Sequence, residues 1–167
     1  MEYQKFENGE NQDSKSYDYD FIIAEAPATF VMDASVCIKW FSGSNEDNVE
    51  KAVKLRSDFL YKRIYIIAPD LIFYEVANAL SFNPKFSEKN VTDAINSLNM
   101  MQVRLIKPIQ QVMEMAVNLR FQKNITIYDS VYLALSRFIN SRFITADIKL
   151  FEKIKDLGNT ILLADYI

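Results

Sequence analysis

The chain has 167 residues, with 19 Lys and Arg, 22 Asp and Glu and no histidine, and half of its residues are hydrophobic. That length and composition predict a single domain with a sizeable core. The absence of histidine excludes Ser-His-Asp and Cys-His catalysis, histidine acid–base chemistry and HExxH zinc sites. One cysteine and three glycines exclude a disulfide framework, a cysteine-built zinc site and glycine-rich nucleotide-binding loops. Any catalysis must therefore use carboxylates, hydroxyls, amides, Lys or Arg.

Charge divides the chain into two parts. Residues 1–28 carry seven acids and two bases, a net charge of −5, whereas the remaining 139 residues carry 15 acids and 17 bases. We therefore expect an acidic N-terminal extension, 1–28, and a folded domain, 29–167. Within the extension, 7–16 has no apolar residue and is expected to be disordered, while 21–24 (FIIA) is an apolar patch that adds a strand or packs on the domain. The mildly basic body keeps nucleic acid open as a partner.

Membrane insertion and export are not expected from this sequence. No apolar run approaches the roughly 18 residues that span a membrane. The N-terminus is acidic and polar, unlike a secretory signal peptide. The cytoplasm is therefore the expected location.

Hydrophobic patterns along the domain predict strands that alternate with helices. In chain order, we expect strand 29–33, helix 36–41, helix 46–62, strand 64–68, helix 70–82, helix 88–101, strand 103–106, helix 109–122, helix 127–139, strand 142–145, helix 148–156 and strand 161–163. Ser35 and Ser87 are expected to cap helices, and Gly158 to end one. This alternation predicts an α/β fold with a parallel sheet covered on both faces. In such sheets, sites form beyond the carboxyl ends of the strands.

Two acids follow predicted strands directly. Asp33 comes after the apolar residues TFVM, and Asp147 comes just past the apolar residues FIT. Both are therefore expected at carboxyl ends of parallel strands. The alternative interpretation of each is a helix N-cap or turn residue, because Asp is common at those positions.

Glu75 lies near the centre of an apolar helix face at about 100° per residue. Asn78 is its only polar neighbour there. An ionised carboxylate buried on such a face without a partner is costly. We therefore interpret Glu75 as a site residue, with pairing to an arginine as the alternative.

Asp129 repeats this pattern on a later helix. Its helical neighbours Ile125, Tyr132 and Leu133 are apolar. It also fits a capping box that begins at Thr126, so the cap and the site remain open as interpretations.

Four acids directed at one place require a proton or a cation to offset their repulsion. Oxygen ligands without histidine or cysteine suit Mg²⁺ or Mn²⁺. Such ions can generate a hydroxide nucleophile and stabilise an in-line phosphoryl displacement. The acids therefore predict a metal-dependent nuclease.

The order and spacing of these acids resemble the motifs of PIN-domain ribonucleases, specifically the VapC-type toxins of toxin–antitoxin pairs. The resemblance runs from residue 29 to the C-terminus. It is carried by Val31-Met32-Asp33-Ala34-Ser35, Pro69-Asp70-Leu71, Glu75-Val76-Ala77-Asn78-Ala79-Leu80, Tyr128-Asp129-Ser130-Val131-Tyr132-Leu133-Ala134-Leu135 and Phe143-Ile144-Thr145-Ala146-Asp147.

The resemblance implies a PIN-like three-layer α/β/α fold with a central, mainly parallel sheet. It implies that a divalent metal and four acids cleave RNA, and that two hydroxyls and an amide support the metal ligands. By position, the acids are Asp33, Glu75, Asp129 and Asp147, and the supporting residues are Ser35, Thr145 and Asn78. Ser35 as a simple N-cap and Asn78 as an ordinary polar residue remain open. The family does not require residues 1–28, and no acid follows at 148–150, where some relatives place one.

The resemblance also implies partners: an RNA substrate, a cognate antitoxin and a second copy in a homodimer. Helices 46–62 and 88–101 are candidate walls of an antitoxin groove. Four bases near the motifs are candidates to bind RNA phosphates: Lys39, Arg142, Lys149 and Lys153. The alternative is that they are simply solvated. Two other functions stay open. One is an RNA-processing or quality-control nuclease without antitoxin, and the other is a PIN-fold interaction module without cleavage, against which the four retained acids argue.

Overall fold

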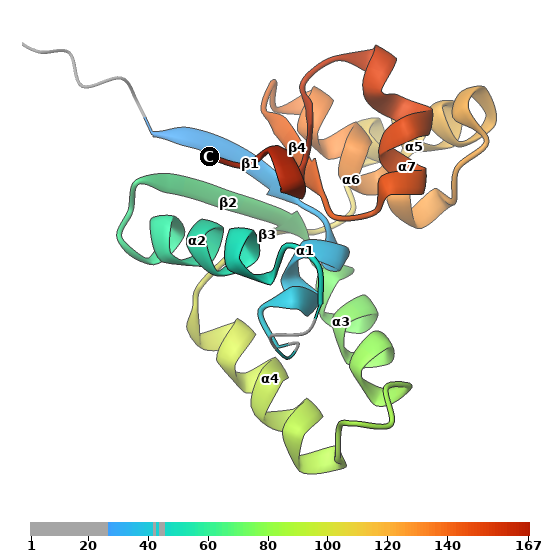
Figure 1. The fold of residues 1–167 in the computed structure, drawn as a ribbon. Helices are drawn as coiled ribbons and strands as arrows, with labels where there is room; N and C mark the ends of the chain where they lie inside the picture. The colour runs from blue at the N-terminus through green and yellow to red at the C-terminus, as the bar shows by residue number, and fades with distance from the viewer. Residues whose placement is uncertain (1–26, 42, 44–45) are drawn as a thin grey trace, which may run out of the picture.

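The computed structural model describes residues 27–41, 43 and 46–167. The expectations for 7–16 and 21–24 lie outside the described residues. Figure 1 shows the elements, which in chain order are β1 Ala28–Met32, α1 Ala34–Lys39, α2 Val49–Leu60, β2 Ile64–Pro69, α3 Ile72–Ser81, α4 Glu88–Met100, β3 Arg104–Ile106, α5 Gln110–Lys123, α6 Ile127–Phe138, β4 Arg142–Thr145, α7 Ile148–Ile154 and β5 Thr160–Leu162. Two 3₁₀ turns, Lys155–Leu157 and Leu163–Asp165, precede and follow β5.

The five strands form one parallel sheet in the order β3-β2-β1-β4-β5. The chain first builds outward from β1 to β3 and then returns to the other side of β1. The strand order therefore reverses between β1 and β4, where Val31 pairs with Phe143 and Met32 with Ile144. Such a reversal is the topological switch point at which α/β sheets form their sites.

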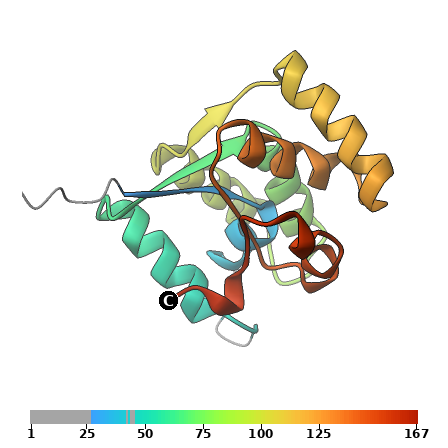
Figure 2. The ribbon, with the colours of Figure 1, turned by 90° about the horizontal axis from the view of Figure 1, so that it is seen from above.

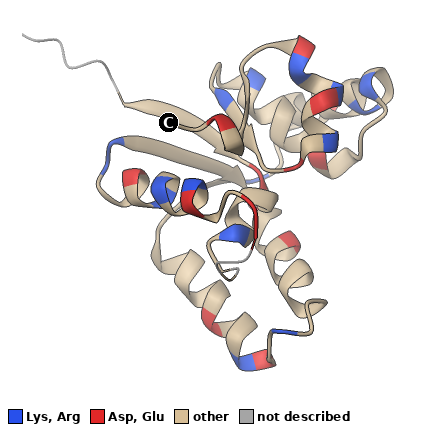
Figure 3. Cartoon of the chain, viewed as in Figure 1, with Lys and Arg blue, Asp and Glu red and all other residues tan. Residues whose placement is uncertain are grey.

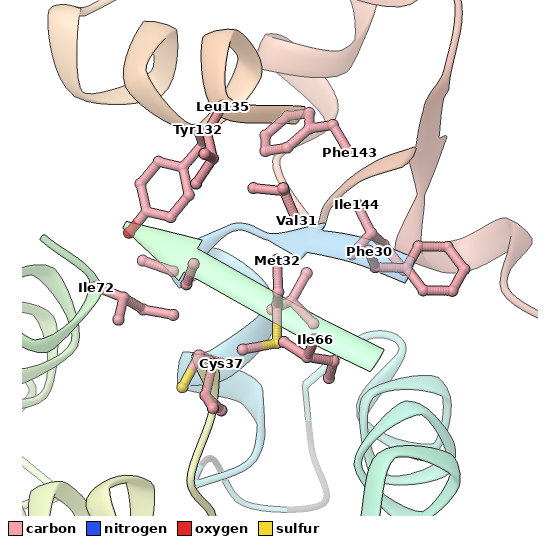
Figure 4. Packing of buried hydrophobic residues seen from close by; sticks show 14 of the residues in the cluster. Phe30, Val31, Met32, Cys37, Ile66, Ile72, Tyr132, Leu135, Phe143 and Ile144 are labelled. Atoms are coloured by element: carbon pink, nitrogen blue, oxygen red, sulfur yellow. The ribbon is translucent and has the colours of Figure 1, made fainter. Parts of the chain in front are cut away.

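Helices cover both faces of the sheet, which confirms the predicted three-layer α/β/α fold. α1 to α4 lie on one side and α5 to α7 on the other (Figures 1 and 2). Figure 4 shows Val31 and Phe143 packed towards Tyr132 of α6, while Met32 points to the opposite face with Cys37. All five side chains are fully buried. Burial on both faces explains why β1 ends in the continuous apolar run 30–32 (FVM) instead of alternating apolar and polar residues.

Of the described helices, α1, α2, α3 and α5 begin one to three residues away from their predicted starts, and α1 also has a different cap. α1 begins at Ala34 with Asp33 at the N-cap position, so the interpretation of Ser35 as the N-cap is wrong. The Ser35 hydroxyl instead donates to the Asp33 carboxylate. The cap expected of Ser87 is confirmed, because it forms a capping box with Asn90 at the start of α4. Gly158, with φ of +72°, follows the 3₁₀ turn after α7.

The C-terminal residues are fixed to α2 through a buried carboxylate. Asp58 is 5% exposed, and its Oδ2 accepts hydrogen bonds of 2.8 Å from the Tyr166 hydroxyl and from Lys54 Nζ. Its Oδ1 accepts a hydrogen bond of 3.0 Å from Arg63. The Tyr166 ring also packs edge-on against Phe30 of β1, with ring centroids 6.0 Å apart. We call this set, Lys54, Asp58, Arg63 and Tyr166, the C-terminal anchor.

None of the helices within the described ranges has the length and apolar character needed to cross a membrane.

Candidate active site

Asp33 lies at the carboxyl end of β1, directly at the switch point, and is 6% exposed. Its Oδ2 accepts two short hydrogen bonds, each 2.6 Å, from Ser35 Oγ and from Thr145 Oγ1 at the end of β4. The same hydroxyls accept backbone N–H bonds from Ala146 and Asp147. The loop after β4 is therefore tied to the start of α1, and the Asp33 carboxylate is held in one orientation.

The surroundings of Asp33 disfavour its charge. Burial raises the pKa of the carboxyl group above its ordinary value. Hydrogen bonds from Ser35 and Thr145 lower the pKa of Asp33, but the negative charge of Asp129 raises it again. The balance leaves the pKa of Asp33 raised.

Glu75 projects from α3 and is half-buried, and its Oε2 accepts a 2.6 Å hydrogen bond from the Tyr132 hydroxyl of α6. Burial raises the pKa of Glu75 to about 7; the Tyr132 bond lowers it, and the charges of Asp33 and Asp129 raise it. Burial and the nearby carboxylates also raise the pKa of Tyr132, so the hydroxyl remains a donor. The alternative of an arginine partner for Glu75 is wrong within the described chain, since no ion pair of Glu75 occurs there.

Asp129 does cap α6, as one of its two interpretations predicted. Its Oδ2 accepts hydrogen bonds from Thr126 Oγ1 at 2.7 Å and Thr126 N at 3.3 Å, and its own N–H donates to Thr126 Oγ1. Its charge nevertheless raises the pKa of both Asp33 and Glu75. Capping and proximity to the other acids are therefore compatible in this fold.

Asp147 caps α7, because its Oδ1 accepts a 3.0 Å hydrogen bond from Leu150 N. It is exposed and shares with Asp129 a hollow of about 400 Å³. Three bases also line this hollow: Arg120, Lys149 and Lys153. Figure 3 shows acidic and basic positions close together around α7. The hollow therefore combines carboxylates with cations able to bind phosphate groups.

The candidate metal ligands of this site are carboxylate oxygens from four separate segments of the chain. Within 27–41, 43 and 46–167, no three carboxylate, cysteine or histidine side chains lie close enough together to share a metal ion. The donor chemistry nevertheless fits a hard cation, since all the candidate ligands are oxygen atoms. Glu75 Oε1, Asp129 Oδ1 and Asp147 Oδ2 form no hydrogen bond with described residues. Each of these carboxylates therefore keeps one oxygen for a ligand while the other stays hydrogen-bonded.

Asn78 and Tyr132 differ in how they are held in the fold. Asn78 is exposed on α3, and its side chain forms no hydrogen bond within the part of the chain that the structure describes. Tyr132, which the sequence places among the apolar helical neighbours of Asp129, is fully buried, but its hydroxyl also bonds Glu75. The signal for this second role was a tyrosine, whose buried hydroxyl requires a partner, on the same helix face as Asp129.

Comparison with protein families identifies the fold. The family model of the PIN domain matches residues 30–157, which is more than half of the chain. The chain belongs to the PIN domain family. PIN domains are a family of nucleases, and the resemblance stated from the motifs is confirmed at the level of this family. A search of curated proteins by sequence gives no match.

Three solved structures share the PIN fold with this chain. A toxin–antitoxin complex from Klebsiella pneumoniae has a TM-score of 0.57 and 16% identity, over 81% of this chain and 97% of that chain. The sarcin–ricin-loop-cleaving toxin VapC20 of Mycobacterium tuberculosis has a TM-score of 0.56 and 12% identity, over 72% and 89%. VapBC2 of Rickettsia felis, bound to a promoter DNA fragment, has a TM-score of 0.55 and 16% identity, over 80% and 96%. At these identities the likeness concerns the fold alone.

Proposed function

We propose that this PIN domain is a divalent-metal-dependent endoribonuclease. The observation that carries the proposal is the Asp33 carboxylate, held by two hydroxyls at the switch point of the sheet. The charges of Asp33 and Asp129 both raise the pKa of Glu75, so three acids from three elements act on one another. A structural ion-pair network would instead lower these pKa values.

Asp33, Glu75, Asp129 and Asp147 are the residues that would hold Mg²⁺ or Mn²⁺. A bound ion would supply a hydroxide nucleophile near neutral pH and would stabilise the negative charge that develops as the leaving ribose oxygen departs from phosphorus. Ser35 and Thr145 orient Asp33, and Tyr132 orients Glu75. The bases of the neighbouring hollow would bind RNA phosphates on either side of the cleaved bond.

The activity test uses purified protein and total RNA, with Mg²⁺ or Mn²⁺ and with excess chelator. Asp33→Asn keeps the shape of the side chain but removes a ligand charge. We expect a rate loss of about two orders of magnitude, roughly 3 kcal/mol in barrier height. The matched control is Asp165→Asn, an exposed acid in the last 3₁₀ turn. Full cleavage in chelator, or by Asp33→Asn, would refute the metal mechanism.

We further propose that the nuclease is the toxin of a type II toxin–antitoxin pair and acts as a homodimer in the cytoplasm. The support is that structural neighbours are described as a toxin–antitoxin complex, a toxin and a VapBC2 assembly. α2 and α4 are the proposed walls of the antitoxin groove. An apolar antitoxin segment laid in such a groove is a common mode of recognition.

Co-expression with the neighbouring reading frame tests the toxin role. We expect a small protein to co-purify with the chain and to suppress RNA cleavage. Light scattering of the free chain should give the mass of a dimer. A cleaving monomer with no such partner would instead favour an RNA-processing nuclease without antitoxin.

A further inference from the structure

A second hollow, of about 700 Å³, lies near the amino ends of β1, β4 and β5, away from Asp33 at the carboxyl end of β1. Its walls include Arg104 at the start of β3, Arg142 at the start of β4, and residues 139–141 of the loop between α6 and β4. None of the residues that line it is acidic. The hollow is therefore a concave surface with two cations and no lining carboxylate.

The polar groups of this hollow lack partners in the described part of the chain. The side chains of Arg104 and Arg142 form no ion pair or hydrogen bond with any described residue. Ser141 is 8% exposed, and its buried Oγ has no hydrogen-bond partner there. Most other bases of the fold do have partners, as Lys54 and Lys123 illustrate. Unpaired guanidinium groups in a hollow suit a carboxylate or phosphate ligand.

The acidic segment 1–26 joins the fold at the wall of this hollow. Ala28 and Thr29, the first residues of β1, both line it. β1 lies between β4, which carries Arg142, and β2, beyond which β3 carries Arg104. The segment therefore enters the domain between the two arginines. It contains seven acids and two bases, a net charge of −5.

The acids of this segment are within reach of the arginines. At about 3.5 Å per residue, the chain from Ala28 to Glu25 can span at most about 10 Å and the chain from Ala28 to Asp20 at most about 28 Å. Tethering on this scale gives an effective concentration in the millimolar range, which an untethered RNA phosphate does not have. The opposite sign of the two charges and the point of attachment both favour the chain's own segment as the occupant.

We propose that the acidic segment 1–26 docks its carboxylates in this hollow, with Arg104 and Arg142 as their partners. This interaction does not depend on the proposed nuclease function, because none of the four candidate acids lines the hollow. It gives the uneven charge of the sequence a role in the folded protein.

A nitroxide label on the segment tests the proposal in the full chain. Ser16→Cys provides one reactive thiol, because the native Cys37 is fully buried and burial raises the pKa of its thiol. Paramagnetic broadening of backbone amide signals is then measured against the reduced label. We expect selective loss of signal at 139–142. The comparison region is 61–63. It precedes Ile64, which pairs with Ala28, so this region is also within reach of the segment.

Charge substitution separates docking from random contact. Arg104→Gln with Arg142→Gln should abolish the selective broadening, and so should 0.5 M salt. The matched control is Lys85→Gln with Lys107→Gln, two exposed bases without ion pairs among described residues, and it should leave the broadening unchanged. Equal broadening at 139–142 and 61–63 would overturn the proposal. A second outcome would also overturn it: the label causes no broadening, but a short single-stranded RNA shifts the amide signals of the hollow. The hollow would then be assigned to RNA phosphate and not to the acidic segment.

Discussion

Glu75 shows how burial and neighbouring charges can make the ionised form of one side chain unfavourable in the fold. Burial and two neighbouring acids raise its pKa to about 7, although the Tyr132 hydroxyl bonds its carboxylate. The sequence predicted the apolar surroundings from helical spacing. It did not predict the partner, because Tyr132 is 57 positions away and only the tertiary fold brings it to α3.

The raised pKa of Glu75 predicts a pH-dependent penalty in the metal-free protein. Between its ordinary value of 4.5 and about 7, the unfolded chain loses the Glu75 proton while the folded chain keeps it. The contribution of this group to stability therefore falls as pH rises through that window. Glu75→Gln should raise the melting temperature at pH 8, and the gain should shrink towards pH 4.5. A gain that is constant across pH would contradict this assignment.

Tyr132→Phe tests the orientation of Glu75 while keeping the buried ring. We expect RNA cleavage at saturating Mg²⁺ to fall about tenfold, since one hydrogen bond to a carboxylate is worth roughly 1.5–3 kcal/mol. The missing bond should also raise the pKa of Glu75 further. Tyr65→Phe, at an exposed tyrosine of β2, is the control. Unchanged cleavage by Tyr132→Phe would show that the hydroxyl only satisfies its own burial.

At the scale of elements, two site candidates also stabilise helix starts: Asp129 lies in the capping box of Thr126, the N-cap of α6, and Asp147 is the N-cap of α7. Both interpretations of each acid therefore remain compatible. The sequence could predict these caps, because capping depends on residues close together in the chain. Most helix and strand positions were predictable for the same reason. It misassigned the cap of α1, because the Ser35 hydroxyl bonds Asp33 and the loop after β4, 111 positions away.

The two roles of Asp147 can be separated by substitution. Asp147→Asn keeps a capping oxygen and should change the metal-free melting temperature little, whereas Asp147→Ala should cost about 1 kcal/mol. Both should reduce the rise in melting temperature produced by millimolar Mg²⁺ or Mn²⁺. If Asp147→Asn retained the full metal-induced rise, Asp147 would be a cap and not a ligand.

At the scale of the whole molecule, alternating strand and helix patterns predicted the layers correctly. The sequence indicated where polar residues end β1 and β4, but not the order β3-β2-β1-β4-β5, which depends on long-range pairing. The C-terminal anchor was also missed. Asp58 lies on a helix whose pattern alone gives no reason for its burial, and its partners Arg63 and Tyr166 lie outside that helix.

The C-terminal anchor predicts sensitivity of the fold to acid. Hydrogen bonds from Lys54, together with Tyr166 and Arg63, lower the pKa of Asp58. The stability this gives is present above the ordinary value of 3.8 and is lost as pH falls below it. Asp58→Asn should therefore destabilise the protein at pH 7 by about 1–3 kcal/mol, and less near pH 3. Thermal melts should show a smaller effect for Asp93→Asn, which breaks only an exposed pair with Lys89. An equal effect of both substitutions would contradict the anchor.

The position of β1 has a consequence for synthesis on the ribosome. Among the described strands β1 is made first, but its neighbour β4 begins only at Arg142. The hydrogen bond between Asp33 and Thr145 joins residues 112 positions apart. Contacts of such large sequence separation form late in folding, because the intervening chain must be closed first. A nascent chain therefore carries Asp33 long before the switch point can form around it. A prematurely terminated product that ends before β4 would release Asp33 without Thr145 or Asp147, so translation itself delays the pairing of Asp33 with Thr145 until the domain is almost complete.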